Sequence, residues 1–196
     1  MLTLSKFVPA LMLSMLSASA LASLEIEGPA TFQSQVRAYL KVGKSISPHT
    51  HRLISAIASA SMPVTIHPVT ADPETWHPRG NATRSHTRST SSDGVIIYIN
   101  PKRIDPSHKS YSSGTLIHEL VHALDLTSKR YHRDYVVREK RAVFFQNIWR
   151  QAHQREFREH YHWRFTTDEY QQAQKTGNID DFIDYFFTYD DLPLTP

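Results

Sequence analysis

The chain has 196 residues, no cysteine and a formal net charge of +3 at pH 7. The lack of cysteine excludes disulfide bonds and thiol redox regulation, so the fold depends on packing or on a bound metal. Basic residues are dispersed among acidic ones, a pattern that gives no indication of a nucleic-acid partner. The 12 histidines raise both the affinity for metals and the chance that a histidine motif arises by accident.

Residues 1–22 have the layout of a cleaved secretory signal peptide. Lys6 precedes an apolar run, and the segment ends in the small residues around Ala20 and Ala22. The apolar run is shorter than the ~20 residues of a membrane-spanning helix. We therefore expect a secreted or periplasmic protein without stable membrane insertion after cleavage. Residues 23–196 are expected to form a single domain of ordinary size.

Local patterns along the chain predict an α+β domain with a small mixed or antiparallel sheet. Apolar residues at helical spacing predict helices over 31–42, from Ser47-Pro48 to before Pro63, and over 115–127, 135–155 and 179–188. Runs rich in β-branched residues predict strands over 64–69 and 94–100. The segment 70–93 is rich in Pro, Gly, Ser and Thr without periodicity, so it is predicted to be a long loop or irregular excursion.

The predicted helix 115–127 contains the motif H-E-x-x-H. His118 and His122 are four residues apart, so they lie one helical turn apart on the same face and can both reach one Zn²⁺. Glu119 lies about 100° around the helix from His118, where it can act as a general base on zinc-bound water without ligating the metal. Burying these polar side chains without partners on an otherwise apolar helix would cost several kcal/mol. This cost favours a site for one zinc ion per chain over a purely structural helix.

A hydrolytic zinc site needs a third protein ligand, and Glu139 is the predicted one. The distance from His122 along the chain leaves room for a helix end, a turn and a second helix that returns beside the first. His132 and Asp134, in the connection, remain as alternatives, and an exposed Glu139 paired with neighbouring basic residues is the interpretation without a metal. Asp125, one turn beyond His122, is expected to accept a hydrogen bond near the site or to mark the helix end.

With these residues the chain resembles the glutamate-ligand zincins, and among them the small zinc metallopeptidases found among bacterial secreted effectors and toxins. The similarity covers residues 47–147, and HELVH is its specific part. Asp125 and Ser128 stand where the metzincin pattern has Gly and His, which excludes that class. The resemblance implies three metal ligands and one general base: His118, His122 and Glu139 as ligands, and Glu119 as base.

The resemblance also implies two features around the metal. In such zincins an edge strand of the sheet lies beside the metal and pairs with the substrate backbone, and residues 95–100 are the candidate strand. A metallopeptidase further needs a donor for the oxyanion of the tetrahedral intermediate. The sequence leaves six candidates for this donor: Tyr131, His132, Tyr135, His160, Tyr161 and His162.

The predicted function is that of a secreted zinc-dependent endopeptidase, which hydrolyses proteins or peptides with zinc-bound water activated by Glu119. A first alternative is a zinc hydrolase or amidase acting on cell-wall material, because the substrate is not readable from the sequence. A second alternative is a non-catalytic metal-binding interaction domain. The intact Glu119 argues against the second alternative, since metal binding alone would not need this carboxylate.

Overall fold

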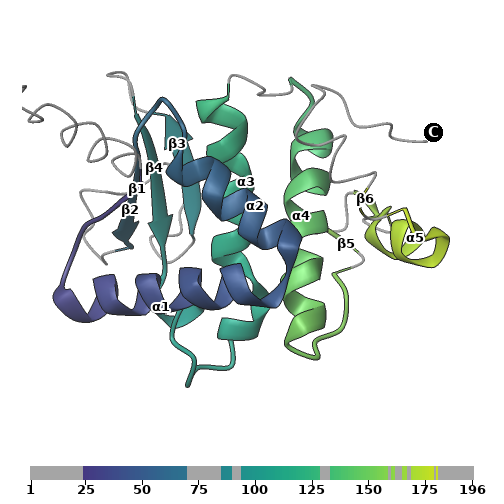
Figure 1. Ribbon diagram of the computed structural model, residues 1–196, viewed down its shortest axis with the longest axis horizontal. Coiled ribbons are helices and arrows are strands. Elements are labelled where there is room, and N and C mark those ends of the chain that lie inside the picture. Colours follow the sequence, from purple (N-terminus) through teal and green to yellow (C-terminus); the bar gives the residue numbers. More distant parts are fainter. Residues whose placement is uncertain are drawn as a thin grey trace, which may run out of the picture.

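A computed structural model describes residues 24–69, 85–89, 94–128, 133–158, 160–161, 165–166, 169–178 and 180. The predicted signal peptide lies outside these residues, as does the predicted last helix apart from Asp180. The chain forms a sheet at one side, with helix α3 between the sheet and helix α4 (Figure 1). This arrangement brings the two helices predicted to carry metal ligands side by side.

The sheet has four strands and is mixed, which confirms the predicted α+β class. Its order is β1-β2-β4-β3, with β2 parallel to both β1 and β4 and with β3 antiparallel to β4. The strands are β1 (Leu24–Ile26), β2 (Val64–Pro68), β3 (His86–Ser89) and β4 (Val95–Ile99). Strand β3 corrects the prediction that the whole of 70–93 is a loop, and β1 was not predicted.

Five α-helices lie in the described part of the chain. They are α1 (Ala30–Ile46), α2 (Pro48–Ala58), α3 (Thr115–Thr127), α4 (Tyr135–Ala152) and α5 (Glu169–Thr176). Short 3-10 helices η2 (Pro101–Arg103) and η3 (Tyr111–Ser113) precede α3, and a small hairpin of β5 (His160–Tyr161) and β6 (Phe165–Thr166) follows α4. No helix among the described residues is both long and apolar enough to cross a membrane.

Helix α1 continues beyond Gly43, where it was predicted to end. Gly43 is buried, and a Cβ atom there would lie 2.8 Å from the Cδ1 atom of Ile54 in α2. The glycine therefore allows α1 and α2 to approach closely and does not stop the helix. A tertiary contact of this kind overrides the weak tendency of glycine to end helices.

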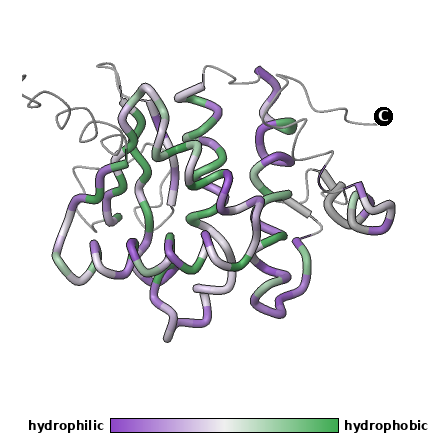
Figure 2. The backbone as a smooth tube through the Cα atoms, in the orientation of Figure 1, coloured by the Kyte–Doolittle hydropathy of each residue, from purple (hydrophilic) through white to green (hydrophobic). Residues whose placement is uncertain are grey.

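The core lies between the sheet and the helices. In β2 and β4 the fully buried residues are spaced two apart, as the two-residue period of a strand requires: Val64, Ile66, Val95, Ile97 and Ile99. The tube coloured by hydropathy is green along these strands and along much of α3 (Figure 2). Helix α3 is buried on most sides, as predicted, so its polar side chains enter the interior.

Candidate metal centre

Helix α3 begins directly after Gly114, whose backbone is in the left-handed region with φ of +70°. A Cβ atom at this position would lie 3.1 Å from Trp149 and 3.2 Å from Gln146, both on α4. Gln146 also donates a hydrogen bond to the carbonyl oxygen of Ser113 at 2.6 Å. The glycine thus provides both the backbone conformation and the space that let α3 start tightly against α4.

Helix α4 begins at a capped end on the other side of the connection. The carboxylate of Asp134 accepts a hydrogen bond from the backbone N–H of Val136 at 2.8 Å, a typical N-cap contact. Asp134 is exposed and caps the start of α4. His132, the other alternative third ligand, lies outside the described residues.

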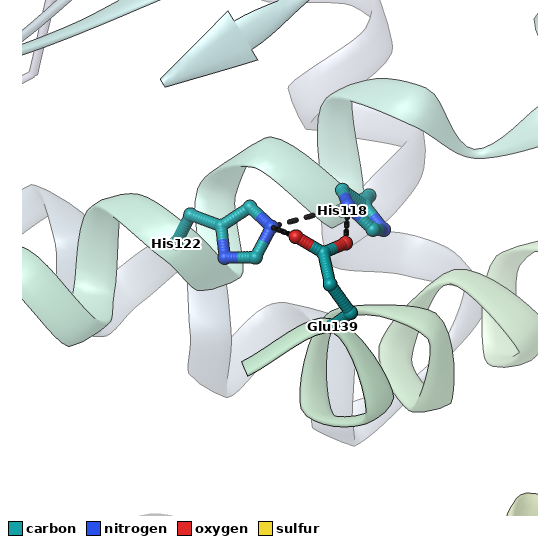
Figure 3. Close-up of side chains that lie close together, drawn as sticks. All are labelled: His118, His122 and Glu139. Carbon is teal, nitrogen blue, oxygen red and sulfur yellow. Dashed lines mark hydrogen bonds and ion pairs between the residues drawn. The ribbon is translucent and has the colours of Figure 1, made fainter. Parts of the chain in front are cut away.

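The two helices bring His118, His122 and Glu139 together (Figure 3). The Nε2 atom of His118 lies 3.2 Å from Oε2 of Glu139, and Nε2 of His122 lies 3.4 Å from Oε1. The two Nε2 atoms are 3.1 Å apart. One ligand atom from each residue lies within 4.8 Å of the others, so the group could hold a metal ion.

The site is buried, and its charges are strongly coupled. Burial raises the pKa of Glu139, but the imidazoles of His118 and His122, which lie close to its two oxygens, outweigh this and hold the pKa far below its usual range. Burial lowers the pKa of His122, but the hydrogen bond to Glu139 and the negative charges of Glu119, Glu139 and Asp125 raise it overall. A positive charge at this point is therefore stabilised by the surrounding carboxylates.

The ligand atoms themselves fit a cation. Both imidazoles direct Nε2 to one point, where two neutral rings would face each other with unshared electron pairs unless a proton or a metal lay between them. Oε2 of Glu139 is buried and has no partner with hydrogen-bond geometry in the described part of the chain, although His118 is close. A metal ion would satisfy all three groups at once.

Glu119 lies next to this group without being part of it. Its side chain is 6% exposed, and its charge is close enough to raise the pKa of His122. Its Oε2 atom accepts a hydrogen bond of 2.7 Å from Oγ1 of Thr87 in β3. Sequence reasoning missed Thr87 because its segment was predicted to be a loop.

Asp125, which was expected to accept a hydrogen bond near the site or to mark the helix end, is paired with an arginine. Its Oδ1 atom lies 3.5 Å from Nη1 of Arg141 in α4, and the two residues are 1% and 0% exposed. The carboxylate therefore links α3 to α4 one turn beyond His122, although its charge also acts on that histidine. The burial of Arg141 was not predicted, because a stretch such as REKR is typical of an exposed helix face.

The strand expected to pair with substrate is also corrected. Residues 95–100 were the candidate edge strand, but β4 lies inside the sheet between β2 and β3, so β3 occupies the edge. Of the candidate oxyanion donors, Tyr135 is 39% exposed. Tyr131, His132 and His162, and the side chains of His160 and Tyr161, lie outside the described residues, so this donor stays a prediction.

Fold and site together define an α+β protein with a buried His-His-Glu group that could hold a metal ion. The chain belongs to the Peptidase_M91 family, described as effector protein, whose profile matches residues 21–143. The matched segment contains α3 and the part of α4 that carries Glu139. No curated protein and no solved structure matches the chain. Family membership supports a peptidase, and hence a protein substrate.

Proposed function

We propose that this chain is a zinc-dependent endopeptidase that acts as a secreted or periplasmic effector. The observation that carries the proposal is the convergence of His118, His122 and Glu139 at one buried point in a chain of a peptidase family. Two histidines and one glutamate form a typical ligand set of hydrolytic zinc sites, in which the fourth position stays open. Nitrogen and carboxylate ligands in this number favour zinc over magnesium or calcium, which prefer oxygen ligands.

Each residue has a separate task in this proposal. The imidazole Nε2 atoms and the carboxylate of Glu139 would hold the ion, which when bound supplies a Lewis acid that polarises the peptide carbonyl and acidifies water. Glu119 would take a proton from the attacking water and deliver it to the leaving amine. Because Glu119 follows His118 directly on α3, the base is carried by the same helix as two of the ligands.

The substrate backbone would bind at β3. This strand lies at the edge of the sheet, and its Thr87 donates a hydrogen bond to Glu119. An edge strand offers unpaired backbone groups that an extended peptide can join by strand addition. The proposal thus keeps the edge-strand role expected from the zincin resemblance but moves it from 95–100 to 86–89.

The decisive variant is Glu119→Gln. We expect the rate of casein cleavage to fall by about 10²–10⁴-fold, the range for loss of a general base, while the zinc content stays near one ion per chain. Glu25→Gln, on an exposed position of β1, is the matched control and should cleave casein at the wild-type rate. Cleavage by the Glu119 variant at the control rate would contradict the proposal.

The same assay addresses the cell-wall alternative. Peptidoglycan replaces casein, and each substrate is incubated with and without a zinc chelator. We expect chelator-sensitive cleavage of casein and none of peptidoglycan, because family membership points to a protein substrate. Chelator-sensitive release of peptidoglycan fragments would instead support an amidase.

A further inference from the structure

The hydroxyl group of Thr87 makes an unusual contact with the active-site helix. Its Oγ1 atom lies 2.7 Å from Oε2 of Glu119 and 3.1 Å from the backbone carbonyl oxygen of the same residue. We propose that Thr87 is a positioning residue, which fixes the carboxylate of Glu119 in the orientation it needs to accept a proton from water. This inference rests on the proposed peptidase function.

The alternation of side chains along β3 explains why Thr87 reaches the helix. Its neighbours lie on the opposite face: the ring of His86 stacks on Tyr98 at 4.9 Å, and Nη2 of Arg88 donates to the hydroxyl of Tyr98 at 2.7 Å. Thr87 is paired in register with Ile97, which is fully buried on the side of the helices. Successive residues of a strand point to opposite faces, so Thr87 must face α3.

The hydrogen bond restricts the rotation of the Glu119 side chain. A glutamate has three rotatable side-chain bonds, and a hydroxyl that donates to a carboxylate forms a strong, charge-assisted bond. With Oε2 of Glu119 held by Thr87, Oε1 is the oxygen left to meet water. General bases act efficiently only when they are held within hydrogen-bond reach of the proton that they remove.

The second acceptor, which is the backbone carbonyl oxygen of Glu119, can receive the hydrogen bond of the Thr87 hydroxyl during the reaction. Thr87 has one hydroxyl proton, which is best directed at the carboxylate while Glu119 is negatively charged. When the oxygen of the attacking water bonds to the peptide carbonyl carbon and one O–H bond breaks, the proton moves to Glu119, so the carboxyl group becomes neutral and a weaker acceptor. The Thr87 hydroxyl keeps its own proton and can then turn to the Glu119 carbonyl oxygen at 3.1 Å.

A purely structural role for Thr87 would be to attach β3 to α3. The two roles differ in what they require, because attachment depends on packing and on the whole side chain, whereas positioning depends on the hydroxyl group alone. Valine retains the shape of threonine without the hydroxyl, and serine retains the hydroxyl without the methyl group. The two replacements therefore separate the roles.

The experiment measures casein cleavage by the full zinc-loaded chain carrying Thr87→Val or Thr87→Ser. We expect Thr87→Val to lower kcat by about 10–100-fold, as for other groups that orient a functional side chain, with KM, zinc content and Tm near wild type. Thr87→Ser should recover most of kcat. Thr65→Val, the same change on the outer face of β2, is the matched control and should leave kcat unchanged.

Three results would overturn the inference. They are an unchanged kcat in Thr87→Val, equal losses in the valine and serine variants, or a loss in Thr87→Val that lies in KM alone. Should the valine variant not fold, Thr87→Ala and Thr87→Ser form a second pair that differs only in the hydroxyl, and equal kcat values in that pair would also overturn it. Glu119→Gln is assayed in parallel: an active Glu119→Gln variant contradicts the proposed function, whereas an inactive one beside a fully active Thr87→Val variant contradicts the positioning role alone.

Discussion

Helices α3 and α4 enclose two buried groups of charged side chains that lie about one turn apart. One group is His118, His122 and Glu139, and the other is the pair of Asp125 and Arg141. Each group places a carboxylate in the interior, which is costly unless a positive charge accompanies it. The two groups differ in where this positive charge comes from.

Arg141 carries a permanent charge, because a guanidinium group does not lose its proton in proteins. The carboxylate of Asp125 is therefore balanced from within the chain. Within the described residues, Glu139 faces the imidazoles of His118 and His122, which become cationic by taking up a proton, and the pKa shifts of Glu139 and His122 both favour this state. A buried carboxylate opposite histidines is therefore balanced by an exchangeable cation, either a proton or a metal, whereas one opposite arginine is balanced by a permanent charge.

Removing the permanent cation should have the largest effect of the changes that test this comparison. Arg141→Met leaves Asp125 buried without its guanidinium, and breaking a buried ion pair in this way costs about 3–5 kcal/mol. We expect this loss in the free energy of unfolding of the zinc-loaded protein, measured in urea. The zinc affinity of the folded protein should change far less, because Arg141 contributes no ligand atom.

Two companion variants control this test. Lys140→Met alters the adjacent, partly exposed position of α4 and should change stability by less than about 0.5 kcal/mol. Adding Asp125→Asn to Arg141→Met removes the uncompensated charge and should restore part of the loss. Equal stabilities for Arg141→Met and Lys140→Met would show that the pair is not balanced as described.

A change in the exchangeable group, which is His118, His122 and Glu139, should instead affect zinc affinity more than stability. Structural zinc sites bind with about 10–16 kcal/mol over four ligands, so Glu139→Ala should weaken zinc binding by roughly 2.5–4 kcal/mol, or about 10²–10³-fold. Zinc titration with a competing chelator measures this change. When both variants are measured without metal, the free energy of unfolding should fall less in Glu139→Ala than in Arg141→Met. The reason is that Glu139→Ala leaves no permanent charge without its partner.

Asp134→Ala is the control for this titration. It removes the N-cap of α4 and should cost about 1 kcal/mol of stability with little change in zinc affinity. His132→Ala, at the other alternative position, should likewise leave zinc binding near wild type. Unchanged zinc affinity in Glu139→Ala, with a loss in either of these variants, would assign the third ligand to the connection between the helices.

The sequence revealed the exchangeable group because its signals are local. The spacing of apolar residues predicts α3 with the bounds that it has, 115–127, and two histidines four residues apart must share a face of that helix. Glu139 required one further inference, that the next helix returns beside the first. The structure confirms this packing and brings the three side chains together.

The features that were missed all depend on contacts between distant segments. Strand β3 has four residues, all of them polar, and is specified by pairing with β4, so Thr87 gave no local signal. Arg141 lies among charged residues, and only the position of Asp125 on another helix explains its burial. Gly43 ends no helix because Ile54, in the next helix, packs against it.

A third buried polar group differs from these two groups because it is uncharged at neutral pH. Tyr39 is 1% exposed and stacks on Trp149 at a ring distance of 4.0 Å. Burial and the nearby Tyr111 raise the pKa of Tyr39 well above its usual value, and the backbone of Ile117 offsets this only in part. Such a group needs no cation at pH 7, and its burial should lower the stability of the fold only at alkaline pH.

The sign of this effect follows from the raised pKa. Above about pH 10 the unfolded chain releases the Tyr39 proton while the folded chain keeps it, so the unfolded state binds fewer protons and stability falls by up to about 1.4 kcal/mol per pH unit. We expect this decline between pH 10 and 11 in urea unfolding of the wild-type protein. Tyr39→Phe should reduce the decline by that amount while Tyr111 remains as in the wild type, so the difference between the two proteins isolates Tyr39. The same pH dependence in both would show that Tyr39 ionises in the folded state as readily as in water, contrary to the view that a buried anion here needs a cation beside it.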